Sequence, residues 1–199
     1  MGSVHTGVPQ ALVMFLKERF GRRCFVETGT LGGNSASWAA RIFPSVYTIE
    51  ASEPLWQAAR QRYSQLSNVR FIHGDSPSQL ATLIPTLERP LFWLDAHWSG
   101  GPTAGQEAEC PLLRELATIS AVRPEEAFIL IDDARFFLEP PPPPHKWEQW
   151  PDMAEVTALL RACGEPHVSV KNDVIIAVPR SARPDLVAFW RRAPESAHA

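Results

Sequence analysis

Acidic side chains recur at one kind of position along this 199-residue chain. Each of five carboxylates ends an apolar, strand-like run or closely follows it: Glu27, Glu50, Asp75, Asp95 and Asp132. Because parallel strands bring their carboxyl ends to the same edge of a sheet, we expect these acids to line one crevice. A single acid at such a position is usually a helix cap, so it is the recurrence that favours a functional site.

The first of these acids belongs to a glycine-rich turn, FVETGTLGGNS, at residues 25–35. A strand-like run breaks there into glycine, and the apolar spacing predicts a helix over Ser35–Ile42. Such a turn presents free backbone N–H groups and the positive end of a helix dipole beside a groove. The spacing differs from the G-x-G-x-x-G of dinucleotide-binding proteins, and Glu27 would repel a pyrophosphate and favour a cation.

A second acid stands where a ribose would be expected. Glu50 ends the second strand-like run, about 20 residues beyond the glycine turn, and an acid at that distance can accept hydrogen bonds from a ribose diol. The spacing therefore indicates a cofactor of the adenosine type.

The elements that must position these residues alternate between strands and helices. Strands are predicted at 24–27, 46–50, 69–73, 91–95 and 128–132, and helices at 8–20, 35–42, 54–66, 78–84, 108–119 and 153–163. This order is typical of an α/β fold with a doubly wound, mostly parallel sheet and helices on both faces. Two further runs, His167–Val170 and Val174–Val178, predict a C-terminal hairpin that adds one antiparallel strand.

Length and composition limit the organisation and the partners. We expect one main domain over 23–180, preceded by a helical segment at 1–22 and followed by a helix and tail at 181–199. A net charge of -3 gives no reason to expect nucleic acid or an anionic membrane as partner, which favours a small molecule. Three widely spaced cysteines favour a reducing cytoplasm, and no apolar run reaches the roughly 20 residues that span a bilayer. The oligomeric state stays open, and a homo-oligomer is compatible with the sequence.

Residues 27–35, ETGTLGGNS, resemble the first motif of the class I S-adenosylmethionine-dependent methyltransferases. The resemblance covers roughly residues 23–178 and implies a Rossmann-like fold with S-adenosylmethionine as cofactor. In that family Glu50 corresponds to the ribose-binding acid, and 74–76 to the segment beside the adenine. The donor-binding residues that it implies are Glu27, Thr28, Gly29, Thr30, Gly32, Ser35, Glu50, Ala51, Gly74, Asp75, Ser76 and Asp95.

A more specific resemblance joins LFWLDAHWSGG to FILIDDARFF. These segments are similar to the metal-dependent O-methyltransferases of the catechol and macrocin types, which implies that Asp95, Asp132 and Asp133 hold Mg²⁺. The chain departs from the catechol type because no lysine follows Asp95-Ala96-His97-Trp98-Ser99. The catalytic base is therefore expected to be His97 or Asp95. His97 could instead be a metal ligand or cap a helix, and the sequence leaves these roles open.

Together these patterns favour methyl transfer from S-adenosylmethionine to a hydroxyl of a small-molecule acceptor, assisted by a divalent metal. One alternative is a metal-dependent hydrolase or an iron-dependent oxygenase built on Asp95, His97 and Asp132. Another is a non-catalytic module that keeps the cofactor cleft and binds a protein through its proline-rich segment, Pro140–Trp150. Specificity lies in loops, so the local patterns do not name the acceptor.

Overall fold

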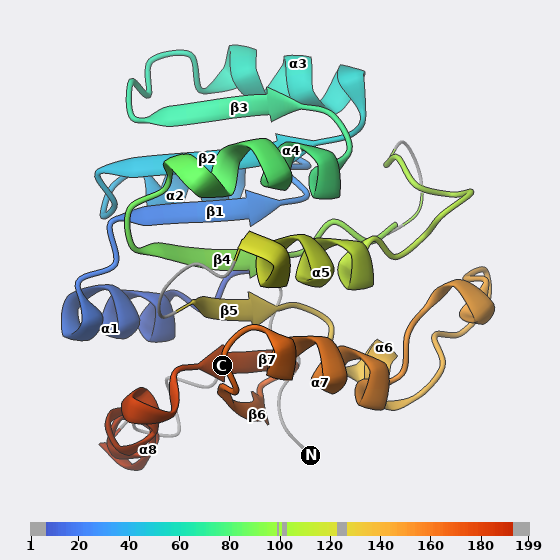
Figure 1. Ribbon diagram of the computed structural model, residues 1–199. Helices are drawn as coiled ribbons and strands as arrows, with labels where there is room; N and C mark the ends of the chain where they lie inside the picture. The colour runs from blue at the N-terminus through green and yellow to red at the C-terminus, as the bar shows by residue number, and fades with distance from the viewer. Residues whose placement is uncertain (1–6, 99, 101–102, 123–126, 193–199) are drawn as a thin grey trace.

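A seven-stranded mixed sheet runs through the middle of the molecule (Figure 1). The structure is a computed structural model that describes residues 7–98, 100, 103–122 and 127–192. The strands follow the spatial order β3-β2-β1-β4-β5-β7-β6. Their bounds are β1 (Cys24–Thr28), β2 (Ser45–Glu50), β3 (Val69–His73), β4 (Pro90–Leu94), β5 (Phe128–Ile131), β6 (His167–Lys171) and β7 (Val174–Val178).

The direction of the strands confirms the predicted fold class. Strands β1 to β5 pair in parallel, whereas β7 pairs antiparallel with both β5 and β6. The chain moves outward from β1 to β3 and then returns to β4 on the other side of β1. Connections that leave β1 and β4 therefore diverge, and in such sheets the ligand crevice opens at that point.

Helices cover both faces of the sheet. α4 (Ser76–Leu83), α5 (Leu112–Val122) and α7 (Met153–Ala162) lie on the face turned toward the viewer in Figure 1. α1 (Gln10–Phe20), α2 (Asn34–Ala39) and α8 (Arg183–Arg192) contribute to the core on the opposite face. The remaining elements are α3 (Glu53–Arg62), α6 (Arg135–Leu138) and the short 3₁₀ helices η1 (Ile84–Thr86), η2 (Trp147–Gln149) and η3 (Arg180–Ala182).

Three helices start two or more residues away from the predicted position, and a proline lies at each start. α1 begins at Gln10 rather than at residue 8, directly after Pro9. α5 begins at Leu112 because the carbonyl oxygen of Pro111 accepts the first helical bonds, from the N–H groups of Arg114 and Glu115 at 3.0 Å. A residue before proline is also biased away from helical geometry. α4 begins earlier than predicted, since Pro77 fits the first turn and the Asp75 side chain accepts a bond from Ser78 N.

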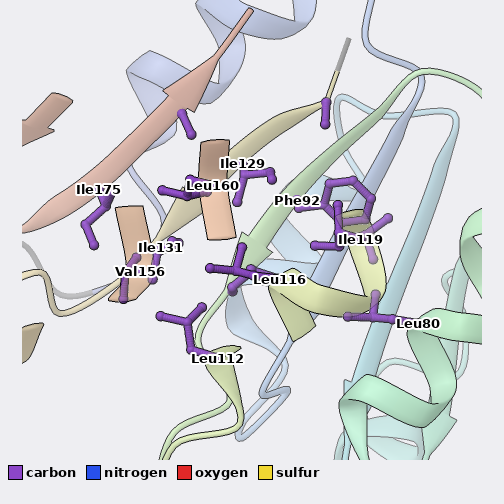
Figure 2. Close-up of a cluster of buried hydrophobic side chains, with 14 of the residues drawn as sticks. Leu80, Phe92, Leu112, Leu116, Ile119, Ile129, Ile131, Val156, Leu160 and Ile175 are labelled. Atoms are coloured by element: carbon purple, nitrogen blue, oxygen red, sulfur yellow. The ribbon is translucent and has the colours of Figure 1, made fainter. Parts of the chain in front are cut away.

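Two apolar cores hold the layers together. Figure 2 shows the core under α4, α5 and α7, where Leu80, Leu116 and Leu160 meet Phe92 and Ile129 of the sheet. Strands β1, β2, β4, β5 and β7 bury one row of side chains in this core and the alternate row in the core beneath α1, α2 and α8, whereas the edge strands β3 and β6 stay partly exposed. Burial on both faces explains why β4, β5 and β7 are continuously apolar.

The long connections leave the carboxyl end of the sheet. In Figure 1 the arrowheads of β1 to β5 point to this end, and the segments 103–111 and 139–152 extend beyond it. Within the described part of the chain, none of the helices has the length and apolar character needed to cross a bilayer.

Candidate active site

A cavity of about 440 Å³ opens at the carboxyl ends of the parallel strands. Its wall includes residues from the loops after β1, β2, β3, β4 and β5, as the topology predicts. Ten of the residues singled out in the sequence line it: Gly29, Glu50, Ala51, Gly74, Asp75, Ser76, Asp95, His97, Asp132 and Asp133.

Glu50 braces the glycine-rich turn at one end of the cavity. Its two carboxylate oxygens accept bonds from the backbone N–H groups of Leu31 and Ser52, both at 2.9 Å. Gly29 has a positive φ of 84°, and a Cβ there would overlap the carbonyl oxygen of Asp95. Leu31 also lines the cavity and is 53% exposed, although the sequence analysis passed over this apolar residue.

Glu27 lies beneath the turn rather than in the cavity wall. It is 2% exposed, and it accepts a bond from Thr48 Oγ1 at 2.6 Å, which in turn lies 2.6 Å from Thr30 Oγ1. Burial raises the pKa of Glu27 to about 8, and the nearby charges of Asp95 and Glu50 act in the same direction. The other predicted donor residues outside the wall are Thr28, Thr30, Gly32 and Ser35.

Replacing Glu27 with glutamine should change how stability depends on pH. The folded-state pKa of Glu27 is raised to about 8 from an ordinary value of 4.5, so folding takes up a proton in this window. The resulting stabilisation is present below pH 4.5 and is lost as the pH rises toward 8. Glutamine does not titrate, so the free energy of unfolding should fall less steeply with pH, by up to about 1.4 kcal/mol per pH unit.

Urea denaturation between pH 5 and pH 8, within the window that the Glu27 pKa defines, measures this difference. Asp95 and Asp132 titrate in both proteins, so the change in slope reports Glu27. Glu53→Gln, at an exposed position on α3, is the control and should keep the native slope. Equal slopes for Glu27→Gln and the native protein would show that Glu27 is ionised across this range.

Beside Asp75 and Ser76 lie two residues that the sequence analysis did not single out, Arg114 in the cavity wall and Glu115 outside it. Arg114 donates from Nη2 to Asp75 Oδ2 at 3.0 Å, and the Ser76 hydroxyl donates to Glu115. Burial raises the pKa of Glu115 to about 7, although hydrogen bonds from Ser76 and Thr28 act to lower it. Glu115 lies on the buried face of α5. An acid at a position where the helical pattern expects an apolar residue is the feature of the sequence that could have identified it.

Asp95 and His97 meet at the other end of the cavity. His97 Nε2 lies 3.4 Å from Asp95 Oδ1 and 3.0 Å from Asp133 Oδ2, while both ring nitrogens are buried without a well-aligned hydrogen bond. Burial lowers the pKa of His97, but the carboxylates of Asp133, Asp95 and Asp132 outweigh it and raise the value. Burial also raises the pKa of Asp95 to about 7, which His97 opposes and Asp133 increases.

The two aspartates after β5 face different partners. Asp132 Oδ1 accepts the N–H of Asp133 at 2.9 Å, and burial together with Asp95 and Asp133 raises the pKa of Asp132 to about 8. Asp133 instead accepts a bond from Arg135 Nη1 at 2.7 Å, and Arg135 also pairs with Asp173 of the β6–β7 turn. Hydrogen bonds and charges from His97 and Arg135 outweigh burial and lower the pKa of Asp133.

In the described part of the chain, no three or more His, Cys, Asp and Glu side chains are grouped as a metal site requires. The predicted Mg²⁺ site of Asp95, Asp132 and Asp133 therefore stays a prediction. What the structure brings together is a buried imidazole among three carboxylates, with Arg135 at its rim.

Solved methyltransferase structures share this fold. An O-methyltransferase from Bacillus cereus in complex with SAH (S-adenosylhomocysteine) superimposes with a TM-score of 0.60 and 18% identity, over 88% of this chain and 83% of that one. An SAH-bound methyltransferase from Podospora anserina gives a TM-score of 0.56 and 18% identity, over 88% and 79% of the two chains.

A short sequence match points in the same direction. Over 52 residues the chain is 42% identical to a protein-L-isoaspartate O-methyltransferase of Cellvibrio japonicus. The matched stretch covers 25% of this chain and 23% of that protein. No protein-family model matches the chain. The glycine turn, the strand order with its reversed β7 and these likenesses agree, and the chain has the fold of the class I S-adenosylmethionine-dependent methyltransferases.

Proposed function

We propose that the protein transfers the methyl group of S-adenosylmethionine to a hydroxyl group of a small-molecule acceptor. The observation that carries this proposal is the continuity of the cavity, which runs from the glycine turn and Glu50 to His97 and Asp132. One end suits an adenosyl donor, and the other offers acid–base groups to an acceptor. The O-methyltransferases among the structural neighbours support the same chemistry.

The donor leaves the protein little covalent chemistry to perform. The sulfonium of S-adenosylmethionine already carries an activated methyl group, so the chain must align the acceptor oxygen, exclude water and remove a proton. Glu50 accepts bonds from the ribose hydroxyls, and the turn around Gly29 holds the donor against the end of β4. Glu27 supports this turn from beneath through Thr48.

His97 is the proposed base. It lines the cavity, and Asp95 and Asp133 on its Nε2 side stabilise the imidazolium that forms when it takes the acceptor proton. A pKa above the ordinary histidine value makes this ring a stronger base near neutral pH. Asp95 is the second candidate for the same role.

We further propose that Asp95, Asp132 and Asp133 hold a divalent metal, with Mg²⁺ as the expected ion. The donor set is chemically suitable, because it consists of hard carboxylate oxygens. Burial, followed by the nearby charges of Asp95 and Asp133, raises the pKa of Asp132 to about 8, and a cation would offset both effects. A bound cation would lower the pKa of the acceptor hydroxyl and orient its oxygen. We expect Asp133 to exchange its contact with Arg135 or His97 for the metal.

Replacing Glu50 with alanine should weaken donor binding. Loss of a charged hydrogen bond to the ribose costs about 1.5–3 kcal/mol, which corresponds to a roughly 10- to 150-fold higher Kd. Calorimetry with S-adenosylhomocysteine measures it. Glu53→Ala, on the exposed surface of α3, should bind like the native protein. Native affinity in a folded Glu50→Ala variant would remove Glu50 from the donor site.

A turnover screen separates the proposed function from its alternatives. S-adenosylhomocysteine release is followed with catechols, other phenols and sugar derivatives, and with an isoaspartyl peptide as a further arm. Hydrolysis or oxidation that depends on iron and not on S-adenosylmethionine would favour the alternative metal chemistry. Tight S-adenosylhomocysteine binding without turnover of any acceptor would favour a non-catalytic module.

A further inference from the structure

Behind His97, a buried carboxylate joins the connection after β4 to the segment that precedes α7. Glu109 is 1% exposed. It accepts bonds from Trp150 Nε1 at 2.8 Å and from the Lys146 N–H at 3.0 Å, and its Oε2 lies 3.1 Å from His145 Nδ1. One side chain thus serves three donors from residues 145–150.

The backbone of the same residue extends the connection in both directions. The Glu109 N–H donates to Gln149 Oε1 at 2.9 Å, and the Glu109 carbonyl oxygen accepts the N–H of Trp98 at 2.7 Å. Trp98 directly follows His97 in the chain. Glu109 therefore ties the end of the β4 segment to both the 103–111 loop and the 145–150 segment.

Aromatic rings carry this connection to His97. The Trp150 ring lies 5.2 Å from the His97 ring, and the Phe136 ring lies 6.5 Å from it on a nearly perpendicular plane. Trp150 and Phe136 also contact each other, with their centroids 5.3 Å apart. Trp150 is 8% exposed, so its indole N–H needs the buried acceptor that Glu109 supplies.

Glu109 does not belong to the cavity wall formed by the described residues, and neither do Trp98, Phe136, His145 and Trp150. The three donors outweigh burial and lower the pKa of Glu109, so the carboxylate stays charged. An acid shortly before a helix can also favour the start of that helix through the helix dipole. α5 begins at Leu112, however, and the Glu109 side chain is bound elsewhere.

We propose that Glu109 is a positioning residue that fixes the His97 ring at the cavity wall through Trp150 and the Trp98 backbone. The inference rests on the proposed function, in which His97 takes the acceptor proton. Its physical part, the effect of Glu109 on the His97 ring, is independent of any acceptor. Glu109→Gln tests it. The carboxylate offers two acceptor oxygens to three donors, whereas the amide offers only one oxygen and places its NH₂ group, itself a donor, against one of them.

Three measurements compare Glu109→Gln with the native protein. The ¹⁵N-labelled ring signals of His97, assigned with His97→Gln, should shift or broaden. Amide hydrogen exchange at Lys146 should become about 10- to 100-fold faster. If the acceptor screen finds a substrate, kcat should fall by about 10- to 100-fold, with the affinity for S-adenosylhomocysteine within about twofold of native.

Two further variants keep the test decisive. Glu107→Gln is the matched control, because the Glu107 side chain is 95% exposed and reaches only the Lys146 ammonium, at 3.9 Å. It should leave the His97 signals unchanged. Trp150→Phe retains an aromatic ring against His97 but removes the N–H that Glu109 accepts, so it should move the same signals even if Glu109→Gln does not fold.

Unchanged His97 signals in a folded Glu109→Gln or Trp150→Phe variant, despite faster exchange at Lys146, would reduce Glu109 to a loop anchor and overturn the proposal. Displaced His97 signals with native kcat would overturn it as well, since the position of the ring would then not matter to the reaction. If no acceptor is methylated, the proposed function fails by itself, and the ring signals still decide the role of Glu109.

Discussion

His97→Gln is expected to lower the rate of methyl transfer by about 10²- to 10⁴-fold, the usual contribution of a well-placed acid–base group. His97 lines the cavity with its Nε2 3.0 Å from Asp133 and 3.4 Å from Asp95, and its side chain is only 9% exposed. Glutamine fills a similar volume but cannot take a proton at neutral pH. The affinity for S-adenosylhomocysteine should stay close to native.

Chemical rescue distinguishes a base from a structural ring. His97→Ala leaves a gap beside Asp133 that free imidazole can enter, and added imidazole should restore part of the lost turnover. His167→Ala, on the edge strand β6, is the control and should keep native activity. Native turnover in His97→Gln would transfer the base role to Asp95, whereas loss of activity without rescue would indicate a packing role for the ring.

The arrangement of the sheet could be predicted because it depends on short-range patterns. Strands β1 to β5 are short, mostly apolar runs separated by helices, and the turn at Lys171-Asn172-Asp173 marks the C-terminal hairpin. The one-turn helix α6 is too short to show a helical period, so no pattern in the sequence indicates it. The early start of α4 depends on the Asp75 cap, which a periodicity analysis does not capture.

The candidate site could be predicted to the extent that topology alone determines it. Acids at strand ends must meet at one edge of a parallel sheet, so Glu50, Asp95 and Asp132 could be grouped without coordinates. The long-range pairs around the site could not be predicted in this way. Asp173 binds Arg135 across 38 residues, and Glu109 binds Trp150 across 41. No local pattern records such pairings.

The same limit applies to the roles of residues that a motif groups together. The resemblance to a motif groups Glu27 and Thr30 with the donor-binding residues, yet they form a buried network with Thr48 beneath the turn. A motif shows which residues occur together, and it does not separate those that touch a ligand from those that support the loop. The roles of Glu27 and Thr30 toward the donor therefore stay predictions.

Removal of divalent metal is expected to abolish methyl transfer while leaving donor binding largely intact. The reason is that Asp95, Asp132 and Asp133 are buried close together. Burial, with their mutual repulsion as a further cause, raises the pKa of Asp95 to about 7 and that of Asp132 to about 8. His97 and Arg135 offset the charge of Asp133. Asp95 shares His97 with Asp133, and Asp132 forms no ion pair among the described residues, so a bound cation would relieve their repulsion.

Turnover should therefore fall to background in EDTA and return on addition of Mg²⁺, and calorimetry with S-adenosylhomocysteine should give a nearly unchanged Kd throughout. Asp132→Asn should reproduce the loss and resist rescue by Mg²⁺, since the site lies outside the two apolar cores and the variant is expected to fold. Asp185→Asn, on α8 and paired with Arg19, is the control for removing a carboxylate elsewhere. Full activity in chelator, with Asp132→Asn still inactive, would instead mean that the carboxylates act on the acceptor through His97 alone, because a neutral His97 ring held beside Asp133 and Asp95 can serve as the base without a cation.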